Sequence, residues 1–221
     1  MTSSLHLWLI PVLPLIGAAI NGFFGRRFSR QTVSAVALTF CGASFAMALY
    51  VAARFSSLEL PHAELLAHWI RSGSFMVNFE FYLDQLTLVM LLVVTGVGFL
   101  IHIYSIGYMW EDDGFYRFFS YLNLFMFFML TLVLAGNYLQ LFIGWEGVGL
   151  ASYLLIGFWF TKDSAASAGK KAFIVNRIGD FGFLIALFLL IKHFGSLSFA
   201  EVFSAVAQQP GEAAGFGLLS S

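Results

Sequence analysis

Charged residues are scarce in this sequence. Asp, Glu, Lys and Arg make up 10% of its 221 residues, whereas soluble domains carry about 25%. So few charges cannot cover the surface of a water-soluble domain of this size. The net charge of −1 also argues against a nucleic-acid partner, because binding to a polyanion depends on an excess of positive charge.

Cysteine is almost absent, and the usual cofactor motifs are missing. The single Cys41 excludes an intrachain disulfide and a cysteine-ligated cluster. The segment Gly147-Val-Gly149 lacks the third glycine of a dinucleotide-binding loop and lies inside an apolar run. His62 and His68 have no further metal ligands at suitable spacing. We therefore expect this chain to bind no cofactor and no metal.

Apolar residues are abundant instead, at 60% of the chain. A helix needs roughly 20 mainly apolar residues to cross a bilayer. Runs of about that length predict an all-α, polytopic membrane protein with six complete spans and the start of a seventh at 213–221. The six runs are 7–24, 32–53, 85–108, 118–135, 139–160 and 172–191.

The segments between these runs predict the topology and two minor elements. In the polar interval 54–83, alternation over 74–83 predicts a short strand pair at the surface, and 197–207 has the spacing of a surface helix. Basic residues near span ends favour the inner side of a membrane. Seven of them fall in alternate loops and three in the others, which predicts an outer amino terminus. The seven are Arg26, Arg27, Arg30, Arg117, Lys162, Lys170 and Lys171; the three are Arg54, Arg71 and Lys192.

Glu146 lies near the middle of the fifth run, which contains no Lys or Arg. An ionisable group at that depth costs about 2.5–3.5 kcal/mol on insertion scales and marks a functional site. Burial favours a neutral carboxyl group and a nearby cation favours the ionised one, so Glu146 is a candidate proton relay. The alternative is an inert, protonated structural acid. Gly144, Gly147 and Ala151 lie on the opposite side of the helix and predict close packing there.

The sixth run carries Arg177 and Asp180, three residues apart and therefore able to pair on one helix. One reading is a structural ion pair, and the other is a pair that modulates a proton path. Their polar stripe, which also includes Lys170, Phe173 and Asn176, should pack against the fifth run or its neighbours rather than face lipid.

Three further residues are possible members of a proton path. His102 in the third run is either a relay or a hydrogen-bonded structural histidine. Lys170 and Lys171 lie at the inner edge of the sixth run, where the alternative role is anchoring of the topology.

Asp84 precedes the third run, where a carboxylate suits the start of a helix.

Long motifs in the fifth and sixth runs resemble one family. These are NYLQLFIGWEGVGLASYLLIGFW from Asn137 and KAFIVNRIGDFG from Lys171, supported by IYSIGYM from Ile103 and RFFSYL from Arg117. They are similar to the L subunits of proton-pumping NADH–quinone oxidoreductase (respiratory complex I), whose mitochondrial counterpart is chain 5. The related A subunits of multisubunit cation/proton antiporters share these motifs more loosely.

This resemblance implies a fold of two inverted five-helix repeats, each with a broken helix and a proton half-channel. Residues 1–110 would hold helices 1–3 with the outer loop 54–83, and 111–221 the start of the first repeat. The family's proton-path glutamate falls on Glu146, and its sixth-helix Arg and Asp fall on Arg177 and Asp180.

The resemblance also implies the protein's setting. Its partners would be protons, the lipid bilayer and other membrane-arm subunits, in a bacterial plasma (inner) membrane or an organellar inner membrane. NADH, FMN, iron–sulfur clusters and quinone would belong to other subunits, so this would be a non-redox subunit of the enzyme. The lysine that opposes the glutamate lies in the family's seventh helix, which this sequence does not reach. We therefore expect a fragment or truncated product that is inactive alone.

Overall fold

The computed structural model describes residues 5–73 and 75–208, and six of its helices are long and apolar enough to cross a membrane. This confirms the six predicted spans and a multi-pass membrane protein; the predicted seventh span lies outside the described residues. The six helices are α1 (Leu9–Phe24), α2 (Arg30–Arg54), α3 (Gln85–Tyr108), α4 (Phe115–Val133), α5 (Tyr138–Ile156) and α6 (Asp163–Phe194). Short 3-10 turns, Gly25–Arg27 and Phe55–Ser57, follow α1 and α2.

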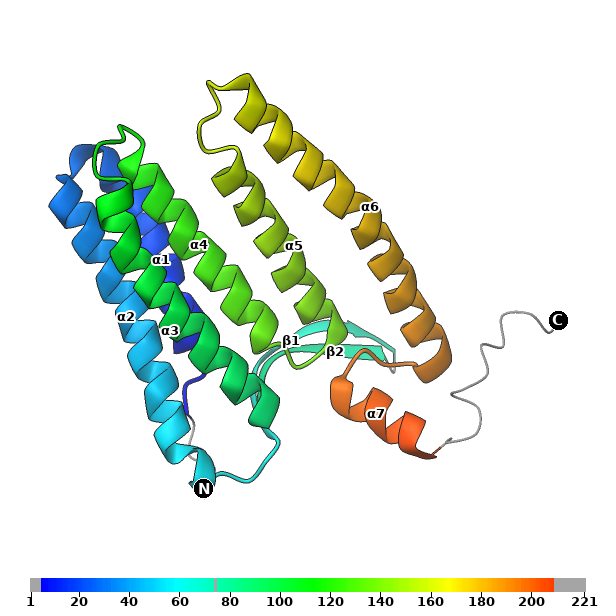
Figure 1. The fold of residues 1–221 in the computed structure, drawn as a ribbon. Helices are drawn as coiled ribbons and strands as arrows, with labels where there is room; N and C mark the ends of the chain where they lie inside the picture. Colours follow the sequence, from blue (N-terminus) through cyan, green and yellow to red (C-terminus); the bar gives the residue numbers. More distant parts are fainter. Residues whose placement is uncertain (1–4, 74, 209–221) are drawn as a thin grey trace.

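Helices α1 to α4 form a bundle, and α5 and α6 extend from it in sequence order (Figure 1). Helix α1 packs against α2 and α4, and α4 in turn packs against α5. Buried apolar side chains fill the bundle, including Ile10 from α1, Cys41 from α2, Leu91 from α3 and Leu130 from α4. The bundle therefore has its own core, to which α5 and α6 are added.

Polar side chains define where several helices begin. The Asp84 carboxylate accepts a hydrogen bond from the Thr87 backbone N–H at 2.7 Å, which confirms the predicted helix start. Asn137 caps α5 in the same way, through the Gln140 N–H at 2.9 Å. The C-terminal end of α6 is defined by a glycine instead. Gly195 adopts φ +68, the left-handed conformation that commonly ends a helix.

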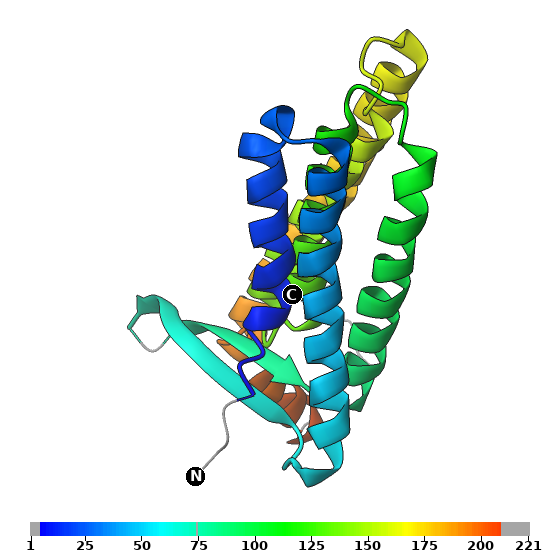
Figure 2. The same cartoon turned by 90° about the vertical axis from the view of Figure 1, so that its left-hand side faces the viewer.

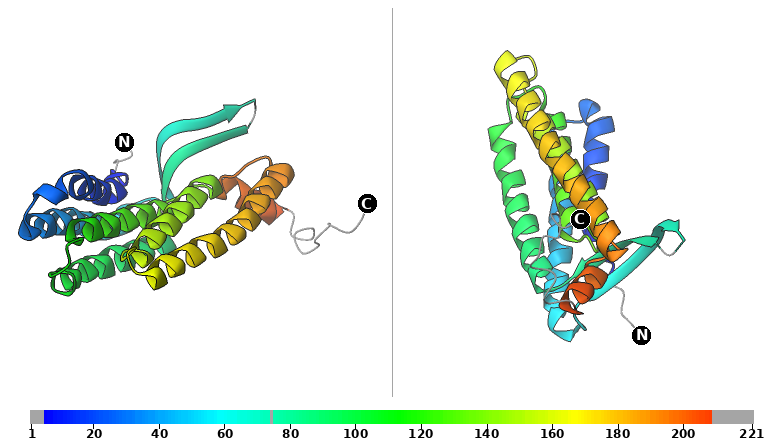
Figure 3. Two further views of the ribbon diagram at one scale, coloured as in Figure 1. Left: turned by 90° about the horizontal axis from the view of Figure 1, so that it is seen from above. Right: turned by 90° about the vertical axis from the view of Figure 1, so that its right-hand side faces the viewer.

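The polar interval contains a two-stranded antiparallel hairpin of β1 (His62–Ser72) and β2 (Phe75–Leu83). The prediction of a strand pair within 74–83 was wrong, because residues 75–83 form a single strand and its partner, β1, lies upstream. Burial explains why only β2 alternates: Val77 packs beneath the hairpin, while most of β1 is exposed. Figures 2 and 3 show the hairpin projecting sideways from one end of the helices.

A short helix, α7 (Phe199–Gln208), confirms the predicted surface helix. Its Phe199 ring contacts the Tyr138 ring at the start of α5, with centroids 4.6 Å apart. The Tyr138 N–H also donates to the Leu197 carbonyl at 3.0 Å. Helix α7 is thus held at the same end of the molecule as the hairpin (Figure 1).

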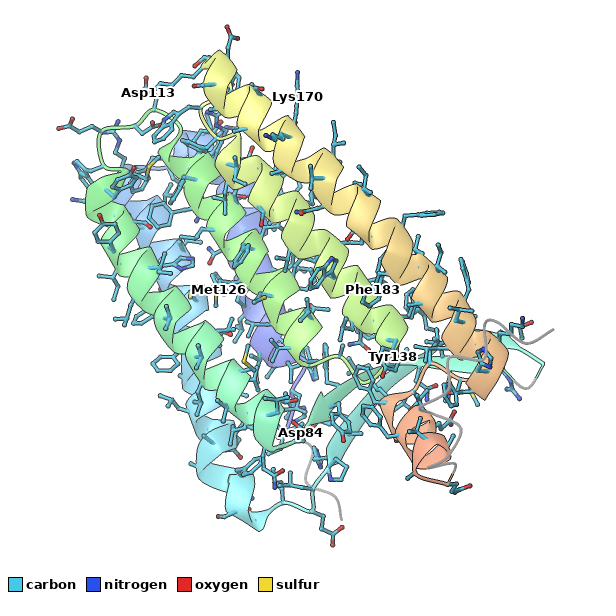
Figure 4. The ribbon with its side chains drawn as sticks, turned by 45° about the vertical axis from the view of Figure 1, so that its right-hand side comes forward. Asp84, Asp113, Met126, Tyr138, Lys170 and Phe183 are labelled. Atoms are coloured by element: carbon cyan, nitrogen blue, oxygen red, sulfur yellow. The ribbon has the colours of Figure 1, made fainter. Side chains whose placement is uncertain are left out.

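The loops with most basic residues lie together at the opposite end. Figure 1 places the α1–α2, α3–α4 and α5–α6 connections at one end and the hairpin and α7 at the other. In Figure 4, Asp113 and Lys170 mark the first end, and Asp84 and Tyr138 lie toward the second. This confirms the predicted alternation of loops. Which end faces the cell interior stays a prediction.

Candidate functional site

Helix α5 packs against α4 along its glycines, as predicted. A Cβ atom on Gly144 would lie 2.6 Å from Leu132 Cα, and one on Gly147 would overlap the Phe128 ring. Real side chains cannot approach a neighbouring backbone so closely, so α4 and α5 can meet only because these positions lack a Cβ. This packing turns the opposite side of α5, which carries Glu146, toward α6.

The cation opposite Glu146 comes from α6. Arg177 forms an ion pair with Glu146, and its Nη1 atom lies 3.6 Å from Asp180 Oδ2. The predicted Arg177–Asp180 pair is present, and Arg177 also supplies Glu146 with a cation, although the fifth run itself contains no Lys or Arg. The reason is helix pairing: α5 and α6 form an antiparallel hairpin that sets the two charged positions side by side.

Aromatic side chains lie beside the charges. Trp145 Nε1 donates a hydrogen bond to Asp180 Oδ1 at 2.8 Å. The Arg177 guanidinium lies over the Phe173 ring at 4.6 Å, and Phe142 stacks on Phe183 with centroids 5.2 Å apart. Figure 4 shows Phe183 at the α5–α6 interface. We call Glu146, Arg177, Asp180 and Trp145 the α5–α6 charge cluster.

Trp145 is the member that sequence reasoning missed. An indole N–H in an apolar helix needs an acceptor, and its position directly before Glu146 was the available signal. The predicted stripe on α6 is only partly confirmed: Asp180 is buried as expected, whereas Asn176 is exposed.

The charge cluster is partly open. The Asp180 side chain is 10% exposed, Glu146 is 23% exposed and Arg177 is 35% exposed. The two acids therefore share one cation at unequal burial. Arg177 thus lies within ion-pair distance of both acids at once, Glu146 on α5 and Asp180 on its own helix.

His102 lies apart from this cluster, at the α3–α4 interface. The ring is fully buried. Its Nδ1 lies 2.7 Å from the Gly98 carbonyl oxygen, to which it can only donate, and Nε2 lies 3.0 Å from Asn123 Oδ1. Both ring nitrogens thus have partners inside the amino-terminal bundle. The structure does not bring His102 together with Glu146.

The two lysines lie at the basic-loop end of α6. Lys171 is exposed, and Lys170 lines a cavity between the ends of α4, α5 and α6. Neither forms an ion pair within residues 5–73 and 75–208. Both are thus separate from the Glu146–Arg177 pair.

One acid outside the membrane spans, Glu80, has a raised pKa. Burial raises the pKa of the Glu80 carboxyl group in β2. A hydrogen bond with Asn78 lowers this pKa in part, and the negative charge of the nearby Glu201 raises it. The Glu80 backbone N–H donates to Gln140 at 3.2 Å, which ties the hairpin to the start of α5.

Comparison with known proteins gives two family matches along the chain. Residues 69–119 match the family described as NADH-Ubiquinone oxidoreductase (complex I), chain 5 N-terminus. Residues 135–220, which contain the whole charge cluster, match NADH:quinone oxidoreductase/Mrp antiporter, TM. A curated relative from Mycobacterium tuberculosis, NADH-quinone oxidoreductase subunit L, is 50% identical over 212 residues. Over most of its length the chain is therefore similar to antiporter-like membrane subunits of this kind.

A further relative agrees in sequence, and a solved structure agrees in fold. Subunit L of Rickettsia typhi is 46% identical over 197 residues, which is 88% of this chain. The Mrp complex from Dietzia sp. DQ12-45-1b is 23% identical with a TM-score of 0.77, covering 94% of this chain and 22% of that one. The chain spans about a third of the curated relatives: the Mycobacterium match covers 93% of this chain and 33% of the relative.

Proposed function

We propose that this chain is the first part of a proton-translocating, antiporter-like membrane subunit of NADH:quinone oxidoreductase. The two family matches and the subunit L relatives support this assignment. The proposed subunit has no redox role, and electron transfer between NADH, FMN, iron–sulfur clusters and quinone takes place in other subunits. Its partners are other membrane-arm subunits of an energy-conserving membrane, and the present chain alone is inactive.

The observation that carries the proposal is the shared cation between two acids. Arginine stays charged in proteins, so Arg177 does not itself carry the proton. Glu146 and Asp180 are the groups that can take up and release it. An acid next to Arg177 is favoured in its ionised form, and an acid that loses this partner in apolar surroundings is favoured in its neutral form.

The proposed mechanism follows from this exchange of partners. When Arg177 moves toward Asp180, Glu146 takes up a proton; when Arg177 returns, Glu146 releases it. In the resemblance described above, a seventh-helix lysine supplies a second cation that competes for Glu146. Charge changes elsewhere in the membrane arm would shift this competition and drive the cycle.

The test replaces Glu146 by Gln in the full-length protein within its purified complex, reconstituted in proteoliposomes. Gln keeps the size of the side chain and removes the titrating group, so NADH-driven proton uptake should fall several-fold. The matched control is Glu201→Gln on α7, an exposed acid that lies outside the charge cluster. Normal coupled proton transport in the Glu146 variant would rule the assignment out.

Infrared titration of the Glu146 carboxyl group tests the alternative of an inert structural acid. A relay should change its carboxyl band with pH or during turnover, and an inert acid should stay protonated throughout.

The second candidate is the A subunit of a multisubunit cation/proton antiporter, because the description of the second family match includes Mrp antiporters. Gene neighbours separate the two assignments. Oxidoreductase subunits beside this gene would support complex I, and small antiporter subunits would support the alternative.

A further inference from the structure

A cavity of about 280 Å³ lies where α4, α5 and α6 reach the basic-loop end of the molecule. Each helix contributes a polar side chain: Arg117 and Tyr121 from α4, Tyr153 from α5 and Lys170 from α6. Gly157 and Phe158, which directly follow α5, also line it. Figure 4 shows Lys170 at this end of α6, away from the hairpin.

The Arg117 guanidinium is held in place without a carboxylate partner. It lies over the Phe158 ring at 5.5 Å and the Phe160 ring at 5.0 Å. Within residues 5–73 and 75–208, no acid lies within 4.0 Å of it. Asp112, in the preceding loop, instead accepts hydrogen bonds from the Gly114 N–H and Trp159 Nε1. The two rings therefore hold a cation ready for an external anion.

Lys170 supplies a second cation on another wall of the same cavity. It is exposed and has no ion pair in the described part of the chain. Tyr121 and Tyr153 add hydroxyl groups that can donate hydrogen bonds. Two cations and two hydroxyls around one small cavity match the chemistry of a phosphate group.

The apolar part of the surroundings indicates where that phosphate comes from. Leu154 and Phe158 line the cavity beside the cations. Leu150 lies one helical turn before Leu154 on the same side of α5 and is 40% exposed, so an apolar strip runs from the cavity along a membrane-spanning helix. A free phosphate ion would leave this strip unused, whereas acyl chains would cover it. Basic pockets between membrane helices are known to hold lipid head groups.

We propose that this cavity binds the phosphate of an anionic phospholipid, with Arg117 and Lys170 as its charged ligands. Arg117 belongs to the four-helix bundle and Lys170 to α6. The bound head group therefore bridges the two helices that flank α5 and holds the α5–α6 pair against the bundle. This site is independent of proton transfer at Glu146.

The test uses the full-length protein in its complex, placed in phosphatidylcholine nanodiscs that contain a photoreactive phosphatidylglycerol. Saturable labelling is expected on the peptides that form the cavity, in residues 115–121 and 153–170. Each cation near a membrane surface contributes about five-fold to the binding of an anionic lipid. Arg117→Gln with Lys170→Gln should therefore weaken labelling about 30-fold, and Lys170→Gln alone about five-fold.

The control Arg26→Gln with Arg27→Gln removes the same charge from the same end of the molecule, at exposed positions outside the cavity. Its labelling should stay within about two-fold of the unmodified protein. Equal losses in both double variants would overturn the proposal in favour of general surface charge.

The exchange Arg117→Lys with Lys170→Arg retains both charges and should retain labelling, which guards against a misfolded variant. Unlabelled phosphatidylglycerol should compete and phosphatidylcholine should not. Displacement by millimolar inorganic phosphate as efficient as displacement by lipid would identify a free-anion site and overturn the lipid assignment. Absence of label from both peptides would overturn it as well.

Discussion

The α1–α4 bundle and the α5–α6 pair place polar groups inside a membrane in different ways. In the bundle, neutral side chains bond to backbone carbonyls of neighbouring helices. Ser44 donates to the Ile10 carbonyl at 2.7 Å, Ser120 to Ala18 at 2.8 Å and Asn21 to Val33 at 3.2 Å. The α5–α6 pair instead contains a cation shared by two acids.

The two kinds of polar contact differ in how many arrangements they allow. A hydroxyl bonded to a fixed carbonyl has one good arrangement, so the bundle bonds fix how the helices pack. In the proposed mechanism, the guanidinium between two carboxylates changes its partner by a small side-chain movement. On that proposal, the bundle provides a fixed support and the α5–α6 pair provides the group that switches.

Among three substitutions that test this difference, Arg177→Met should have the largest effect on stability. It leaves Glu146 and Asp180 without a cation, and an acid kept away from water without a partner destabilises the fold. The melting temperature of the purified full-length protein should fall, and two additional protonated carboxyl bands should appear in its infrared spectrum. An unchanged infrared spectrum would mean that both acids are already neutral and that the ion pairs do not form.

Gly144→Ala tests the joint between the two regions. Its Cβ would meet the Leu132 backbone at 2.6 Å, so α5 must move away from α4, at a cost of about 2 kcal/mol. Thermal unfolding in detergent measures this loss. The matched control is Gly149→Ala on the same helix, where nothing lies within 4 Å and the better helix propensity of alanine should leave stability unchanged or slightly raised. Equal effects of the two substitutions would contradict close α4–α5 packing.

His102→Leu should have the smallest of the three effects. It leaves the Asn123 side chain buried without its histidine partner, which costs about 1–2 kcal/mol. The same unfolding measurement, together with proton uptake by the complex, decides between the two roles left open for His102. A loss of stability supports a structural histidine, whereas a loss of proton uptake at full stability would make it a relay and extend the switching region into the bundle.

Much of the architecture was predictable because a bilayer imposes simple rules on sequence. The lengths of the apolar runs predicted the six spans. The small residues on one side of the fifth run predicted a closely packed face, which is the face that meets α4. The basic residues gave the loops that share one end. Glu146, Arg177 and Asp180 stood out individually, because charged residues in apolar runs are conspicuous.

The pairing of those residues was not predictable. Helical spacing relates Arg177 to Asp180 on its own helix, but no periodicity relates it to Glu146, which is 31 positions earlier on another helix. The same limit applies to Trp145 and to the strand partner of 75–83, whose contacts depend on how separate elements come together. The Arg117–Lys170 cavity also joins residues from different helices.

The ion pair across α5 and α6 has a consequence for biosynthesis. Chains grow at about 5–20 residues per second, so Arg177 emerges roughly 2–6 seconds after Glu146. During that interval the acid has left the ribosome and its cation has not. Slower translation between these two codons would prolong the stage at which Glu146 has no Arg177 to pair with.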